Sequence, residues 1–233
     1  MKCMMAVLLL VAMSVPAWAE NGFEGRPITN NLFVPTGYTL HRGEFAIGIG
    51  PVAFGISENL QLETNILLWL FQVYNAGAKI SLVKNDDNAF AVGAGVARLD
   101  LDLADGDDDD GSIEFTAVSP FASLSHRISP STLLHAGARY SYFSSEEDND
   151  IEDVDATATA EGTSVFGGIE YSMSNRTKFV ADGGYDIDFE GTRFGGGVIF
   201  GWTTFRLKLG VSYFTAGDGF VFPNIGLWWR FKG

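Results

Sequence analysis

Cysteine is almost absent from this chain of 233 residues, in which Cys3 is the single example. Because Cys3 lies in a segment that we expect to be removed, we predict no disulfide, thiol catalysis or cysteine metal site in the mature chain. Proline is scarce too, at 7 residues, whereas there are 28 glycines and 19 phenylalanines. This composition is typical of strands joined by turns and differs from that of helical repeats or disordered chains.

Long apolar runs are also missing beyond the first nineteen residues. The longest is ILLWLF at 66–71, far below the roughly 20 apolar residues that a membrane-spanning helix needs. Without such a helix, only a closed barrel satisfies every backbone hydrogen bond inside lipid. If the chain crosses a membrane, it therefore crosses as β-strands.

Basic residues are too few and too scattered for a nucleic-acid partner. The 15 Lys and Arg residues stand against 29 Asp and Glu, and the net charge is −14. Residues 100–110 and 146–155 hold seven acids each and no base, so these two segments account for the whole net charge. Phosphate recognition needs clustered bases, so we expect no nucleic-acid binding.

The first nineteen residues have the pattern of a secretory signal peptide. Lys2 supplies a basic start, residues 6–15 form an apolar core, and 17–19 (AWA) give the small-x-small pattern of a cleavage site. The alternative is a membrane-anchoring helix, for which the apolar stretch is too short. We expect residues 1–19 to be cleaved.

Apolar and polar side chains alternate along several later segments, as they do in strands with one face toward lipid. In the clearest, one face holds Phe205, Leu207, Leu209, Val211 and Tyr213, and the other holds Arg206, Lys208, Gly210 and Ser212. Phe205 and Tyr213 lie at opposite ends of the apolar face, as aromatic girdles at two membrane interfaces require. Segments 89–102 and 112–126 change phase midway, which a β-bulge or a misjudged boundary would explain.

The links between these segments alternate in length. Short links at 57–59, 84–88, 129–131 and 175–176 alternate with others at 103–111, 144–162, 190–192 and 215–219, most of them longer. Short turns on one side and long loops on the other are typical of outer-membrane barrels. Eleven strands are counted from Gly43 to Phe231, and 31–40 (NLFVPTGYTL) could form a twelfth.

We therefore predict an all-β fold, a closed antiparallel transmembrane β-barrel of about twelve strands. The barrel would occupy residues 31–233, after a short extension at 20–30. Ten strands, with the first part of the chain as a plug or extension, is the alternative.

The end of the sequence resembles the carboxy-terminal signal of Gram-negative outer-membrane β-barrel proteins. The matching residues are a polar residue, a glycine two positions later and two aromatics one apart, namely Asn224, Gly226, Trp229 and Phe231. The resemblance implies an outer-membrane location and a final strand that the barrel-assembly machinery reads. In this chain Lys232 and Gly233 follow the last aromatic, whereas that family usually ends on it. Segments 35–44 and 54–62 also resemble uncharacterised porin-like barrels, which implies a fold and no substrate.

Charged residues of both signs lie on the polar faces of the expected strands. The candidates for lining the lumen are Glu63, Lys79, Arg139, Glu170, Asp182, Asp186, Arg193, Arg206, Lys208 and Arg230. Bases would face acids across a water-filled lumen and orient small polar solutes, or else the charges pair within a plugged interior. Glycines on the same face, such as Gly77 and Gly137, favour open space, unless they serve strand curvature.

These features favour a narrow passive channel for small polar solutes. The alternatives are a closed structural or adhesion barrel with acidic, cation-binding surface loops, and a lipid-modifying enzyme. No nucleophile motif accompanies His135, so we predict no catalytic residue and no cofactor. The acidic run lacks the spacing of a calcium loop, so we expect only weak cation attraction at Asp107, Asp108, Asp109 and Asp110. The expected partners are outer-membrane lipid, the assembly machinery and small solutes.

Overall fold

A computed structural model describes residues 23, 28–104, 110–149, 156–215 and 219–231, without the side chains of 101–104, 110–113, 147–149 and 156. The expected signal peptide lies outside the described residues. So do the side chains of the acidic run from Asp107 to Asp110. No helix in the described part of the chain is long and apolar enough to cross a membrane.

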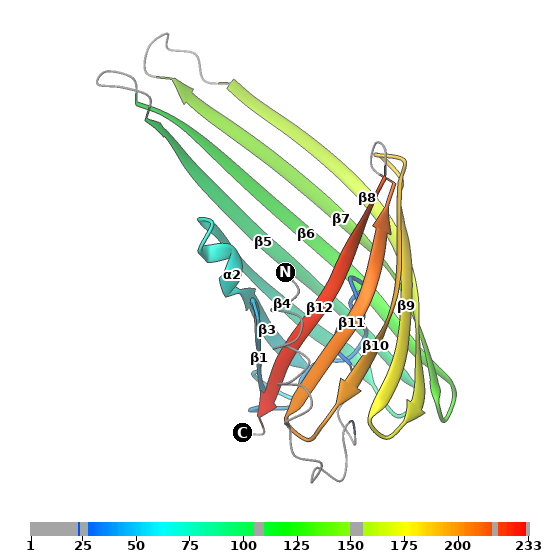
Figure 1. The fold of residues 1–233 in the computed structure, drawn as a ribbon. Coiled ribbons are helices and arrows are strands. Elements are labelled where there is room, and N and C mark those ends of the chain that lie inside the picture. The colour runs from blue at the N-terminus through cyan, green and yellow to red at the C-terminus, as the bar shows by residue number, and fades with distance from the viewer. Residues whose placement is uncertain (1–22, 24–27, 105–109, 150–155, 216–218, 232–233) are drawn as a thin grey trace, which may run out of the picture.

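Twelve antiparallel strands form one closed barrel, as the sequence predicted (Figure 1). Each strand pairs with its neighbours in the chain, and the first pairs with the last. The strands are β1 (Phe45–Gly48), β2 (Pro51–Gly55), β3 (Leu60–Asn65), β4 (Val73–Lys84), β5 (Asn88–Ala104), β6 (Asp110–Ser129), β7 (Thr132–Asn149), β8 (Ala156–Ser174), β9 (Thr177–Asp186), β10 (Gly191–Gly201), β11 (Phe205–Phe214) and β12 (Phe220–Phe231). A single helical turn, α2 (Ile66–Trp69), follows β3.

The number of strands was predicted correctly, but the first of them was assigned wrongly. Residues 31–40 form no strand. The twelfth strand arises because 45–55, read as one segment, is two strands that turn at Gly50, whose φ of +103° favours glycine. Residues 31–40 instead lie in the lumen, so the plug of the alternative interpretation is present together with twelve strands.

The strands differ greatly in length. β5 to β8 have 17–20 residues each, whereas β1, β2 and β3 have 4–6. The four long strands rise beyond the rest as a tall sheet on one side (Figure 1). Much of the long loop expected at 144–162 therefore belongs to β7 and β8.

The change of phase within β5 and β6 has a different cause from the two that were expected. Their pairing runs without a shift from Asn88↔His126 to Ala104↔Asp110, so there is no bulge between them. Outward side chains of β5 are apolar up to Val96 and charged beyond it. There Arg98 forms ion pairs with Asp100 at 2.9 Å and with Glu114 of β6 at 2.8 Å. The strands continue past the apolar zone, and the polarity of their two faces reverses there.

The outer surface of the barrel is apolar over the height shared by most strands. Large outward side chains there are strongly exposed, among them Leu82, Val96, Phe194, Val211 and Ile225. Aromatics on the outward face lie at both ends of this zone, for example Trp229, which packs on the buried Phe205, and Phe194, which contacts Tyr213. A closed barrel with an apolar belt between aromatic girdles has the architecture of outer-membrane barrels.

Candidate functional site: the occupied lumen

Residues 28–44, here called the lumen hairpin, fill the middle of the barrel. The two arms meet in a bridge between Asn30 and Pro35, and the Asn31 N–H donates to the Val34 carbonyl at 2.9 Å. Val34 and Leu40 are buried completely or almost so. The second arm runs directly into β1, so the hairpin enters and leaves at the end of the barrel that carries the short turns.

The apex of the hairpin is held by one acid and one base of the barrel wall. One carboxylate oxygen of Asp182 accepts backbone N–H bonds from Leu32, Phe33 and Val34 at 2.9, 3.1 and 3.2 Å. The Lys208 ammonium donates to the Asn31 carbonyl at 2.6 Å. A buried backbone without strand partners needs such bonds, and charged partners make the strongest.

Serines of β4 and β6 hold the second arm. Ser123 donates to the Pro35 carbonyl at 2.6 Å, Ser81 donates to the Gly37 carbonyl at 2.7 Å, and Ser125 accepts the Gly37 N–H at 2.8 Å. The arm lies against the wall here, because a Cβ on Gly37 would be 2.2 Å from the Ala89 carbonyl oxygen. Glycine is therefore required at position 37 by close approach of two backbones.

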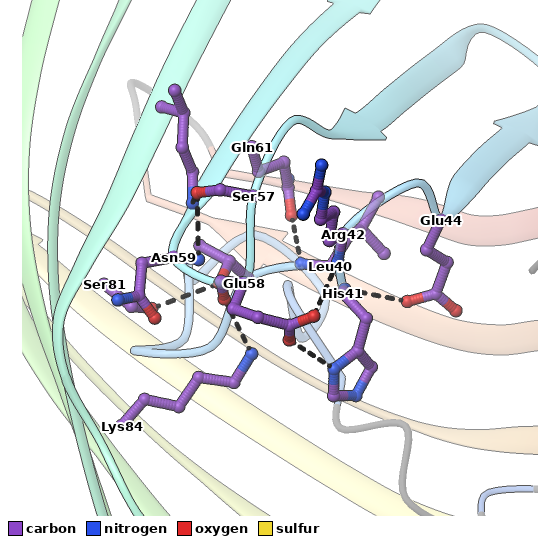
Figure 2. A network of polar contacts seen from close by, with 12 residues as sticks. Leu40, His41, Arg42, Glu44, Ser57, Glu58, Asn59, Gln61, Ser81 and Lys84 are labelled. Atoms are coloured by element: carbon purple, nitrogen blue, oxygen red, sulfur yellow. Dashed lines mark hydrogen bonds and ion pairs between the residues drawn. The ribbon is translucent and has the colours of Figure 1, made fainter. Parts of the chain in front are cut away.

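The base of the hairpin is anchored to the turn between β2 and β3 (Figure 2). Glu58 in this turn accepts from the His41 ring at 3.0 Å and from the Arg42 N–H at 3.3 Å. These two bonds, the ring bond foremost, hold the pKa of the Glu58 carboxyl below its usual value. Beside this turn, the Leu40 N–H donates to Gln61 at 3.0 Å, and Glu44 binds Arg230 of β12 through two bonds of 2.9 and 2.7 Å.

Aromatic rings of the N-terminal part of the chain lie against wall cations. The ring of Phe23 is 4.8 Å from the Lys178 ammonium and 4.7 Å from the Arg206 guanidinium, and the ring of Phe33 is 4.8 Å from the Arg193 guanidinium. Such pairs stabilise cations that are removed from water. Phe23 also packs with Ile28, Leu32, Val180 and Ile199 in one apolar cluster.

The ten residues proposed to line the lumen all lie on strands. Lys79, Asp182, Arg193, Arg206 and Lys208 contact the hairpin or Phe23, and Lys79 does so through a 2.9 Å bond to the Thr29 carbonyl. Arg230 pairs with Glu44, Glu170 pairs with Lys178, and Glu63 accepts from Gln61 at 2.9 Å. Arg139 and Asp186 are half-buried. Six of these ten residues therefore contact the hairpin or Phe23, and Glu170 and Glu63 have partners on the barrel wall.

The inner glycines leave room for the hairpin more than for water. A Cβ on Gly195 would lie 2.9 Å from the Leu32 side chain, one on Gly168 would lie 2.8 Å from Asn31, and one on Gly201 would lie 2.7 Å from Phe23. The interpretation of such glycines as open space was wrong at Gly195 and Gly168, where the hairpin occupies the space. The sequence did carry a signal for the hairpin in the small polar residues at inner positions of β6, Ser123 and Ser125.

Two cavities remain beside the hairpin. The first, here the upper cavity, holds about 440 Å³ between the hairpin, β1–β6 and β11–β12, and its lining includes Glu63, Asn75, Ala117, Lys208 and Trp228. The second, of about 870 Å³, lies at the short-turn end and is lined by Tyr38, Lys84, Asp87, Arg127 and Glu170, among others. The lumen thus has space beside the hairpin that is lined by both charged and apolar residues.

Ser125, His135 and Glu170 lie in a row on the inner wall. Ser125 Oγ is 2.7 Å from His135 Nδ1, and His135 Nε2 is 3.9 Å from a Glu170 carboxylate oxygen. The order resembles a hydrolase triad, but Ser125 is fully buried and also accepts the Gly37 N–H. With the hairpin in place a substrate has no access to this serine.

No metal site accompanies these groups. Among the residues that the structure describes, no cluster of three or more His, Cys, Asp or Glu side chains could hold an ion.

The residues of the carboxy-terminal signature lie in β12, where the barrel closes. Phe231 pairs with Phe45, and Trp229 pairs with Ile47. Both aromatics point outward with 46 % and 40 % of their surface exposed, whereas Asn224 and Gly226 are on the inner face.

Two solved structures have a related arrangement of strands. The translocator domain of the autotransporter NalP from Neisseria meningitidis is 14 % identical, with a TM-score of 0.49 over 81 % of this chain and 86 % of that one. The KdgM porin in complex with disordered oligogalacturonate is 8 % identical, with a TM-score of 0.43 over 82 % and 96 %. No protein-family model and no curated protein matches the sequence.

Proposed function

We propose that this protein is a narrow passive channel for small polar solutes in the outer membrane of a Gram-negative bacterium, with the lumen hairpin setting its bore. The apolar belt, the girdles and the signal-like first nineteen residues support the location. Delivery would use the cleaved signal peptide, and insertion would use the assembly machinery that reads the final strand.

The observation that carries the channel proposal is the chemistry of the inner wall. The hairpin is held largely by hydrogen bonds to Asp182, Lys208, Lys79 and serines, and cavities that include charged residues in their lining lie beside it. Water can replace polar contacts, because an exchanged hydrogen bond changes the free energy by about 1 kcal/mol between neutral groups and by about 1.5–3 kcal/mol where one partner is charged. A hairpin attached in this way can shift and leave a wetted, polar path.

The presence of the hairpin itself favours a second candidate, a closed structural or adhesion barrel. In that case the contacts would be permanent, and the acidic segments on the tall sheet would carry the function. The two candidates differ in whether ions cross the lumen.

Single-channel recording in a planar lipid bilayer separates them. We expect wild-type protein to give small discrete steps, and Asp182→Ala to open more often, because the apex loses its charged acceptor. Asp100→Ala, an exposed acid on the outward face of β5 that lines neither cavity, is the matched control and should behave as wild type. Silence of all three correctly inserted proteins would contradict the channel and support the closed barrel.

A further inference from the structure

The barrel wall has a notch beside its closing strand. A strand that crosses a bilayer needs about 9–11 residues, but β1 has four and β2 has five. β1 pairs with β12 only as far as Gly48↔Trp228, with one more bond from the Ile49 N–H to the Leu227 carbonyl. Within the described residues nothing pairs with residues 220–226 on this side. The wall is therefore closed from the short-turn end up to Leu227, and it is open beyond that point. The notch is this opening between residues 220–226 and Ile49.

The notch lies within the apolar belt. Along its β12 side Val221 and Ile225 point outward with 67 % and 60 % of their surface exposed. Val221 pairs with Tyr213 of the upper girdle, so the open edge reaches from that girdle down into the belt. The opposite side ends in Ile49 and in the apolar run 66–71, where the Trp69 ring lies 6.4 Å from Tyr74.

The open edge is not suited to receive another strand. Because Leu227 directs its carbonyl toward β1, alternation directs the backbone of Val221, Pro223 and Ile225 to the same open side. Proline lacks an N–H there, as is typical of strand edges that remain unpaired. An open edge at membrane depth is tolerated where it borders a water-filled cavity, and the upper cavity, lined by Trp228 of β12 and Pro51 of β2, adjoins the lower end of this edge.

Above this cavity the inner face turns apolar. Ala97 and Ala117 line the cavity, and the next inner residues on the same strands are Leu99 and Phe115. Phe115 stacks on Phe143 with ring centroids 5.9 Å apart. Across the opening, Phe214 stacks on Phe220 at 5.1 Å, and Phe33 of the hairpin lies 6.4 Å from Phe214.

The floor of the cavity is polar and mainly basic. Its charged lining residues are Arg206, Lys208, Arg230 and the single acid Glu63. Arg230 is bound by Glu44, and Arg206 is buried against the Phe23 ring. Lys208 donates one bond to the Asn31 carbonyl and has two further N–H groups, so it is the lining cation that would meet an incoming head group. A basic floor below aromatic walls, open sideways to lipid, matches a molecule with an anionic head and a hydrocarbon chain.

We propose that the notch is a lateral port through which a single-chain anionic amphiphile, such as a long-chain fatty acid, passes between the bilayer and the upper cavity. Its head lies near Lys208, and its chain lies against the aromatic walls and the notch. This proposal rests on the notch and not on the channel, and it holds whether or not ions cross the lumen.

The first test asks whether lipid chains enter the notch. At the base of the notch Trp228 faces inward, and the adjacent Trp229 faces lipid. Two variants are made, one with Trp228 and one with Trp229 as its only tryptophan, and the other tryptophans are changed to Phe. In vesicles of acyl-chain-brominated phosphatidylcholine, we expect strong quenching of both. A third variant has Phe166→Trp as its only tryptophan, behind a complete wall, and should be shielded. Shielding of Trp228 equal to that of Phe166→Trp would overturn the port.

The second test asks whether the cavity binds the amphiphile. Fluorescent parinaric acid should bind the reconstituted protein saturably, and more tightly than the corresponding alcohol. Ala117→Trp fills the cavity and should weaken binding about tenfold or more, equivalent to about 1.4 kcal/mol. Val211→Trp, on the lipid-facing surface, should leave binding unchanged. Binding that is not saturable, or that the two variants change equally, would overturn the site.

Discussion

At the scale of single residues, side chains of the inner wall have the hairpin backbone as their hydrogen-bond partner. Asp182 accepts three backbone N–H bonds through one oxygen, and its own position is buried. Alternation placed Asp182 on the inner face, but nothing in a linear pattern indicates that its partner is a backbone about 150 residues away. The face of each wall residue was therefore predictable, and its partner was not.

Asp182→Ala should destabilise the folded protein by about 3 kcal/mol, because several bonds to a charged acceptor are lost and their donors remain buried. Asp182→Asn keeps an acceptor oxygen and should lose less. Urea unfolding in lipid vesicles measures both, with Asp86→Ala as the exposed control. Equal stability of Asp182→Ala and wild type would show that the apex is not bound there.

The anchor at Glu58 should weaken in acid. Its pKa is lowered by the bonds from His41 and Arg42, so its contribution is present above the unfolded pKa of about 4.3 and is lost as the pH falls through the folded value. The difference in free energy of unfolding between wild type and Glu58→Gln should be constant near neutral pH. It should vanish as the pH falls through the folded pKa of Glu58. A difference that grows on acidification would reverse the assigned sign.

At the scale of elements, the hairpin depends on close contact with β5. Gly37→Ala places a methyl group 2.2 Å from the Ala89 carbonyl oxygen, so the second arm must move. We expect the hairpin of this variant to be cut faster by added protease. Gly183→Ala is the control, since its Cβ would meet nothing closer than 3.6 Å. Equal cleavage rates in the two variants would contradict the close approach.

The strands were predictable from alternation, and the exceptions have physical causes. Residues 31–40 have strand-like composition, but Asn30, Pro35 and Gly37 shape them into a hairpin whose bonds go to side chains. β5 and β6 changed phase because they outrun the apolar zone, where the outward face must be charged. The outward face of such a strand meets lipid along one part and water along the next. A single apolar/polar alternation along the whole strand does not describe both parts.

At the scale of the whole molecule, the hairpin closes off the row of Ser125, His135 and Glu170. We expect no labelling of Ser125 by a fluorophosphonate and no esterase activity, because the serine is buried and hydrogen-bonded. Gly37→Ala displaces the second arm of the hairpin, so labelling of this variant tests whether Ser125 lacks only access to the reagent. Labelling of wild type that Ser125→Ala abolishes would instead favour the enzyme hypothesis.

The central claim is that residues 28–44 lie inside the barrel against the inner wall, and cysteine cross-linking tests it most directly. Thr39 Oγ1 and Ser81 Oγ are 3.4 Å apart, whereas the neighbouring Leu82 points outward with 59 % of its surface exposed. In a protein that also carries Cys3→Ser, mild oxidation of Thr39→Cys/Ser81→Cys should form an intramolecular disulfide. The matched pair Thr39→Cys/Leu82→Cys should form none. Efficient cross-linking of the first pair alone is the result we predict, and equal cross-linking of both pairs, or of neither, would contradict a hairpin bound in the lumen.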